Sequence, residues 1–196
     1  MARKALVTRA TKETRIRLEL NLDGSGQAKI KTGIGFFDHM LNSFARHGFF
    51  DLDLEVEGDL YVDGHHTVED TGIVLGQAIR EALSDKAGIK RYGSFLLPMD
   101  EVLVLCAIDL SGRPYLNFGA KYATERTGEF ENELVREFFY AVSYAAGMNL
   151  HIKLVDGTNS HHITEAMFKA FAKALCEAVT VDCRIVGALS TKGTIQ

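Results

Sequence analysis

Two copies of one short motif, His-His-x-x-Glu, lie about half the chain apart in this sequence of 196 residues. The copies are His65-His66-Thr67-Val68-Glu69 and His161-His162-Ile163-Thr164-Glu165, and they contain four of the seven histidines. Imidazole and carboxylate groups without thiolate suit manganese, iron, zinc or nickel, and they disfavour a structural zinc finger. Because both copies lie on similar sequence backgrounds, they predict a paired metal site built from two related halves.

Helical geometry divides each motif between two ions. Residues four apart share a helix face, so the first histidine and the glutamate of one copy can hold one metal. The second histidine points about 100° away and cannot easily reach the same ion. If the halves meet across a dyad, it reaches the other half's metal instead. The hypothesis is one site of His65, Glu69 and His162, and a second of His161, Glu165 and His66.

The remaining histidines are weaker candidates. His39 follows Asp38 at the start of an amphipathic stretch and is a possible extra ligand, as is His151. A lone histidine such as His47 or His151 is more often a hydrogen-bonded structural residue than a ligand. For the duplicated motifs, the alternative is helix capping or simple solvent exposure.

Periodicity predicts the elements that would position the first motif. Apolar residues alternate from Ile16 to Leu22, the turn at 23–26 follows, and 27–31 is expected to return as the second strand of a hairpin. Residues 36–47 have helical spacing and end at Gly48. A strand over 52–56 then leads to a motif helix that ends near Leu83.

The second half repeats this order. We expect strands over 102–110 and 114–119, a helix over 131–146, a strand over 150–155, and the second motif helix ending near Thr180. The motif helices align without a gap, and residues 13–24 lie over 101–112 with one shift. The predicted fold is α+β: internally duplicated β-rich units, two mixed sheets packed with four helices. The half-repeats are 1–90 and 91–196, within one catalytic domain.

Composition bounds the class of protein. A formal charge of -4 and a pI near 6.0 argue against a general nucleic-acid binder. The basic start lacks the apolar region of a signal peptide, and the longest apolar run, 102–108, is too short to span a bilayer. Three cysteines without Cys-x-x-Cys spacing indicate free thiols in a reducing compartment. We therefore expect a soluble cytoplasmic protein with no nucleic-acid or membrane partner.

The ordered motifs resemble those of the imidazoleglycerol-phosphate dehydratase family, in its monofunctional form. The resemblance covers essentially the whole chain, and it implies a fold like that of domain 2 of ribosomal protein S5. It rests on Thr11-Lys12-Glu13-Thr14, Asn21-Leu22-Asp23-Gly24-Ser25-Gly26, Phe37-Asp38-His39-Met40-Leu41, Asp63-Gly64-His65-His66-Thr67-Val68-Glu69-Asp70, Asp109-Leu110-Ser111-Gly112-Arg113-Pro114, Ser160-His161-His162-Ile163-Thr164-Glu165-Ala166 and Ser190-Thr191-Lys192-Gly193.

The resemblance implies a hydro-lyase of histidine biosynthesis that converts imidazole glycerol phosphate to imidazole acetol phosphate and water. It also implies two Mn²⁺ per active site and a homo-oligomer of 24 subunits built from trimers, with active sites shared between subunits. The implied metal ligands are His39, His65, His66, Glu69, His161, His162 and Glu165. Glu137 stands where the family commonly has a further histidine, and it is included as a candidate ligand. Ser43 stands where some members have a substrate-contacting glutamine.

The resemblance also implies how the phosphorylated substrate is held. The matching positions are Glu13, His47, Arg91, Arg113, Lys169, Ser190 and Lys192. Arg113 lies on a turn, where a guanidinium can bind a phosphate through two hydrogen bonds. For each cation the alternative is a solvated surface charge.

Catalytic roles fall to three carboxylates. We expect Glu165 or Glu69 to act as the base and Glu13 as the acid that protonates the leaving hydroxyl or the enol carbon. Two other functions compete with the lyase: a dinuclear metallohydrolase acting on a phosphoester, and a non-catalytic metal-storage or metal-sensing protein. The first would accept substrates without an imidazole, and the second would need no phosphate-binding residues.

Overall fold

The computed structural model describes residues 3–195, and the order of its elements repeats once along the chain. The first half contains β1 (Lys4–Ala10), β2 (Thr14–Asn21), β3 (Ala28–Lys31), α1 (Gly35–Gly48), β4 (Asp51–Gly58) and α2 (His65–Leu83). The second contains β5 (Tyr92–Met99), β6 (Val102–Asp109), β7 (Tyr115–Gly119), the small β8 (Arg126–Thr127) and β9 (Phe130–Glu131), α3 (Leu134–Ala146), β10 (Asn149–Asp156) and α4 (Ser160–Val179).

Each half forms one mixed sheet with the same strand arrangement. The orders are β1-β2-β4-β3 and β5-β6-β10-β7, with the last strand of each parallel to its neighbour and the other pairs antiparallel. Strand β2 alternates buried and exposed residues along nearly its whole length, so one sheet face is apolar and the other polar. The predicted α+β duplication is confirmed by this topology. The boundary at residue 90 stays a prediction.

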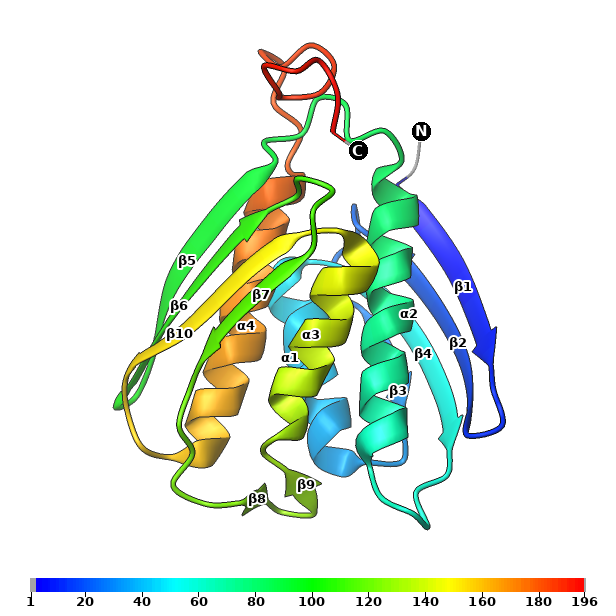
Figure 1. Ribbon diagram of the computed structural model, residues 1–196, viewed down its shortest axis with the longest axis vertical. Coiled ribbons are helices and arrows are strands. Elements are labelled where there is room, and N and C mark those ends of the chain that lie inside the picture. Colours follow the sequence, from blue (N-terminus) through cyan, green and yellow to red (C-terminus); the bar gives the residue numbers. More distant parts are fainter. Residues whose placement is uncertain (1–2, 196) are drawn as a thin grey trace.

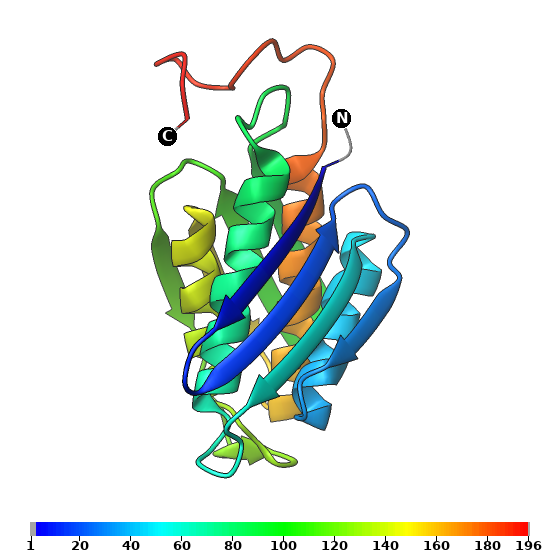
Figure 2. The ribbon, with the colours of Figure 1, turned by 90° about the vertical axis from the view of Figure 1, so that its right-hand side faces the viewer.

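The four helices lie between the two sheets, as Figure 1 shows from one side. Turned by 90°, the sheet β1-β2-β4-β3 lies in front of the helices (Figure 2). Helix α2 packs against α3, and α1 packs against α4, so each contact joins one half to the other. A ligand set that needs residues of both halves is therefore assembled at these helix pairs.

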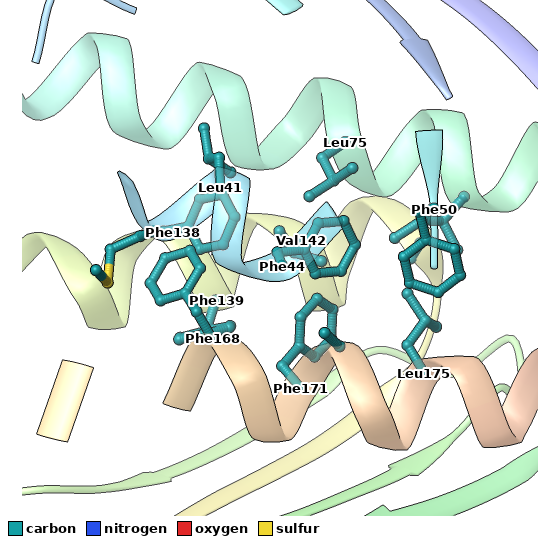
Figure 3. Packing of buried hydrophobic residues seen from close by; sticks show 14 of the residues in the cluster. Leu41, Phe44, Phe50, Leu75, Phe138, Phe139, Val142, Phe168, Phe171 and Leu175 are labelled. Atoms are coloured by element: carbon teal, nitrogen blue, oxygen red, sulfur yellow. The ribbon is translucent and has the colours of Figure 1, made fainter. Parts of the chain in front are cut away.

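Phenylalanines fill the space between the helices (Figure 3). The rings of Phe138 and Phe168 stack with centroids 5.0 Å apart, and those of Phe44 and Phe171 with centroids 5.5 Å apart. All four rings are at most 1% exposed. Burying an aromatic side chain contributes roughly 1.5–3 kcal/mol, so this cluster fixes α1, α3 and α4 relative to one another.

All four helices begin at the same end of the molecule, the lower end in Figure 1. Both His-His motifs open their helices there. The C-terminal segment after α4 lies at the opposite, upper end. No helix within residues 3–195 has the length and apolar character needed to cross a membrane.

Two local predictions are wrong. Residues 28–31 form a strand, but it pairs in parallel with β4 instead of returning beside β2 as a hairpin. Strand β2 pairs with β1 and β4, so neither of its edges is free for β3. The helix expected from 131 begins at Leu134, because Phe130 and Glu131 pair with β8.

Candidate metal centre

One group of metal-ligating side chains is already assembled within the chain. His39 on α1 and His161 on α4 lie 3.5 and 3.1 Å, by their Nε2 atoms, from Oε2 of Glu165. Among residues 3–195 this is the only set of three or more histidine, cysteine or acidic residues whose ligand atoms all lie within 4.8 Å of one another. The His161–Glu165 pair follows from helical spacing, whereas His39 joins it only because α1 packs on α4.

Glu165 is buried and ionised at the base of this group. It is 8% exposed, and its Oε1 lies 2.7 Å from Nζ of Lys169, one turn further along α4, with which it forms an ion pair. Burial by itself raises the pKa of Glu165, but the hydrogen bond and charge of Lys169 outweigh it and leave the pKa lowered. The carboxylate is therefore charged at neutral pH, as a metal ligand must be.

The first motif forms only a half of such a group. His65 Nε2 and Glu69 Oε2 lie 3.5 Å apart on α2, and both side chains are more exposed than Glu165. Glu137 occupies on α3 the place that His39 occupies on α1, since each lies ten residues before the left-handed residue that caps its helix. Oε1 of Glu137 lies 2.8 Å from Nη1 of Arg136, and the two side chains form an ion pair.

The second histidine of each motif is held by a carboxylate from a loop. His66 Nδ1 lies 3.0 Å from Oδ2 of Asp59, and His162 Nδ1 lies 2.9 Å from Oε2 of Glu101. These hydrogen bonds raise the pKa of both histidines. His162 and the backbone N–H of Asn159 in turn lower the pKa of Glu101 to about 2. Within one chain, neither histidine joins the other half's pair, so their exchange across the dyad stays a prediction.

The sequence did not predict that Asp59 and Glu101 contact the motif histidines. Asp59 is the first residue after β4, and a single acidic residue after a strand does not by itself indicate a site. Glu101 lies over Glu13 in the repeat alignment, and that register was the clue that could have found it. Glu13 itself lies 3.8 Å, by Oε1, from Nε2 of His66. The proposed acid is therefore beside the first motif.

Four of the predicted phosphate ligands line one cavity of about 1040 Å³ at the opposite end of the molecule. They are Arg91, Arg113, Ser190 and Lys192. Nε and Nη2 of Arg91 donate to both oxygens of Asp109 at 2.7 and 3.1 Å, and Nη1 donates to the carbonyl of Leu189 at 2.8 Å. The Asp109 hydrogen bonds raise the pKa of Arg91, which stays a fixed positive charge.

The other three predicted substrate ligands lie elsewhere, and one of them, Glu13, is the residue beside His66. Lys169 and His47 line a hollow of about 360 Å³ together with His39, Glu165 and Ser43. Burial, followed by the charges of Lys169 and Lys173, lowers the pKa of His47 and keeps its ring neutral. One chain thus divides the predicted substrate ligands between its two ends.

The distance between the cavity and the metal cluster can be estimated along helix α4. The backbone N–H of Arg91 donates to the carbonyl of Ala178, and Ala178 lies 17 residues after His161 on this helix. At 1.5 Å per residue the cavity is about 25 Å from the metal cluster. That is far longer than a molecule in which a three-carbon chain joins an imidazole to a phosphate.

Comparison with known proteins decides the family. The sequence model of imidazoleglycerol-phosphate dehydratase matches residues 32–175. This chain belongs to the imidazoleglycerol-phosphate dehydratase family. Two relatives named as this dehydratase are 71% identical over 196 residues, in Lachnoclostridium phytofermentans, and 60% identical over 195 residues, in Acetivibrio thermocellus; both alignments cover 100% of each chain.

Solved structures agree with the family assignment. The dehydratase of Staphylococcus aureus superposes with a TM-score of 0.83 at 41% identity, covering 91% of this chain and 99% of that one. That of Pyrococcus furiosus also gives 0.83, at 36% identity, with 96% and 99% covered. The resemblance in the motifs is therefore confirmed at the level of sequence and of fold.

The donor set of this dehydratase fits a divalent metal. His39, His161 and Glu165 offer two imidazoles and one ionised carboxylate, and His65 with Glu69 offers one further imidazole and carboxylate from the first half of the chain. Such mixed nitrogen and oxygen ligands suit manganese as well as zinc, iron or nickel. An ion held by these three residues would have coordination positions to spare for a substrate.

Proposed function

We propose that this protein is a metal-dependent imidazoleglycerol-phosphate dehydratase, a hydro-lyase of histidine biosynthesis. It removes water from imidazole glycerol phosphate and gives imidazole acetol phosphate. The observation that carries the proposal is the His39–His161–Glu165 group in a chain of this family. The metal-storage alternative does not account for the cavity lined by Arg91, Arg113, Ser190 and Lys192. Neither that alternative nor the metallohydrolase accounts for the family motifs.

The cofactor we propose is Mn²⁺, two ions per active site. The residues that would hold them are His39, His65, His66, Glu69, Glu137, His161, His162 and Glu165. Bound ions of this kind supply a Lewis acid for the imidazole ring and compensate negative charge that develops on it. Support for Glu137 is its equivalence to His39 in the duplicated fold.

The chain's own residues bind the substrate and move the protons. Arg91, Arg113, Lys169, Ser190 and Lys192 are proposed to bind the phosphate, and His47 and Glu13 to contact the rest of the substrate. Loss of hydroxide needs a proton donor, and Glu13 is the proposed acid. Loss of the neighbouring C–H proton needs a base, and Glu165 or Glu69 is proposed for it. The ionised state of Glu165 suits a base.

We infer that the working enzyme is a homo-oligomer with shared active sites. The separation of about 25 Å along α4 means that one chain cannot offer its cavity and its metal cluster to the same small substrate. Neighbouring chains could bring the two ends together, and His66 and His162 would then meet metal pairs of other chains. A 24-subunit assembly built from trimers, as the family resemblance implies, has this property.

A cytoplasmic location is part of the proposal. Cys106, Cys176 and Cys183 are free thiols, which suits a reducing compartment. No partner other than the small substrate and further copies of the chain is proposed.

The test is direct. Purified protein is loaded with Mn²⁺, incubated with imidazole glycerol phosphate, and the acetol product is followed. We expect turnover that chelation abolishes and Mn²⁺ restores. Glycerol phosphate, which lacks the imidazole, should release no phosphate. Phosphate release from it would favour a hydrolase, and stable metal binding without product would favour storage.

A further inference from the structure

The second histidine of each motif forms a hydrogen bond through one ring nitrogen, Nδ1, and the other nitrogen, Nε2, lies 3.8 Å from Oε1 of Glu13 in His66 and 3.7 Å from Oδ2 of Asp100 in His162, beyond hydrogen-bond distance. In both cases Nδ1 contacts a carboxylate, at 3.0 Å for His66 and 2.9 Å for His162. An ionised carboxylate only accepts hydrogen bonds, so the proton must lie on Nδ1. In the neutral ring, Nε2 then carries the lone pair that a metal needs.

The carboxylates are themselves fixed in place. Glu101 accepts a 3.0 Å hydrogen bond from the backbone N–H of Asn159 on its other oxygen, and Asn159 caps α4 through its own side chain. The Asp59 backbone N–H donates to the carbonyl of Glu13 at 3.1 Å, and the Asp59 side chain is only 11% exposed. The carboxylate of Glu101 is therefore held by a backbone N–H, whereas Asp59 is held through its own main chain and by the burial of its side chain.

The two halves reach this arrangement with different residues. Asp59 directly follows β4, but the residue that follows β10 is Gly157, which has no side chain. The second half takes its carboxylate from the turn between β5 and β6 instead. The repeat therefore preserves the contact to Nδ1 although it does not preserve the residue. A merely local consequence of duplication would have preserved the residue.

We propose that Asp59 and Glu101 are positioning residues that set the tautomer of His66 and His162, so that Nε2 of each is ready to bind metal. This rests on the proposed function, because it assumes that both histidines are ligands. Carboxylates that orient a ligating histidine typically change metal affinity 10–100-fold when they are replaced.

The decisive variants are Asp59→Asn and Asp59→Ala, with Glu101→Gln and Glu101→Ala as the second pair. An amide loses the charge of the carboxylate and can present its NH₂ group as well as its oxygen to Nδ1, so the proton is no longer held on Nδ1. The amide and the Ala variants should therefore weaken Mn²⁺ binding by roughly 10–100-fold. Asp59→Glu keeps the charge and should recover part of the loss.

Binding is measured from the electron paramagnetic resonance signal of free Mn²⁺, with folding and assembly size checked for each variant. Asp53→Asn and Glu57→Gln are matched controls. Both residues lie on β4, the strand that Asp59 follows, their side chains are half-exposed and exposed, and each forms its ion pair with an arginine and not with a histidine. They should bind as the original chain does.

The proposal would be overturned by unchanged Mn²⁺ affinity in the folded Asp59→Asn, Asp59→Ala, Glu101→Gln and Glu101→Ala variants. That result could occur while the unsubstituted protein still dehydrates its substrate, so the proposed function would survive. An original chain that neither binds Mn²⁺ nor makes product would remove both.

Discussion

Gly76→Ala tests the contact that joins α2 to α3. A Cβ added at Gly76 would lie 2.6 Å from the carbonyl oxygen of Val142 and 2.7 Å from Cβ of Ala145. Ordinary contact between such atoms begins near 3.5 Å, so the helices would have to separate by roughly 1 Å. The obstacle is backbone, which cannot rotate out of the way.

The magnitude follows from two opposed effects. Overpacking of this kind costs about 1–3 kcal/mol, whereas replacing a helical glycine by alanine gains about 1 kcal/mol. The difference is a net loss of about 0–2 kcal/mol, and we expect the upper part of this range because the added Cβ would meet backbone atoms. For a chain of this length that lowers the melting temperature by roughly 4–8 °C at the upper figure.

The assay is thermal unfolding of metal-free protein by circular dichroism at one fixed protein concentration, because association also shifts the melting temperature. Gly35→Ala on α1 is the control: nothing lies within 4 Å of its added Cβ, and it should melt at or slightly above the original. Gly76 lies two turns beyond Glu69 on the same helix face, so weaker Mn²⁺ binding should accompany the loss. A Gly76→Ala protein that melts at or above the original would refute the packing argument.

Four further predictions concern the site and its surroundings. Glu13→Gln should lower kcat strongly while manganese content, measured by atomic emission, stays unchanged; an unchanged rate would remove Glu13 from the mechanism. His39→Ala should bind less Mn²⁺ per chain in equilibrium dialysis than His151→Ala, since only His39 lies in the metal group; equal losses would contradict this. The N–H groups of Ser25 and Gln27 lower the pKa of Asp51 below its ordinary value of 3.8, so its ionised form stabilises the fold above about pH 4 and that contribution is lost as pH falls through the lowered pKa. Urea unfolding should therefore show Asp51→Asn to be less stable at pH 6, by about 1 kcal/mol or less, with the difference shrinking below pH 4. Removing the metal, or protonating its imidazoles at mildly acid pH, should shift the assembly toward trimers; light scattering from an intact shell without metal would contradict the coupling.

The sequence alone determined the chemistry available to this protein. The i, i+4 spacing within each motif is a local property of a helix, so His161 with Glu165 and His65 with Glu69 were predictable as pairs. The duplication of the elements was predictable for the same reason, since apolar periodicity reports each helix and strand independently of its neighbours. The ordered motifs then carried the family.

The pairing of the strands was harder to predict from the sequence. The segment over 28–31 reads as a strand, but which strand it joins depends on how β4 returns along the sheet, and no local pattern encodes that. The short pair β8–β9, which delays the start of α3, is likewise formed by contacts that are weak in the sequence.

Only the tertiary structure decided which side chains meet. His39 is 122 residues from His161 in the chain, and the packing of α1 on α4 brings both to Glu165. Asp59 and Glu101 contact Nδ1 of His66 and His162, and the sequence had predicted neither contact. The cavity lined by Arg91 and the metal group lie at opposite ends of α4, because the backbone of Arg91 pairs with the last turn of that helix. Spacing along the chain fixes neighbours on one helix, but distances between helices come from the buried cores that join them.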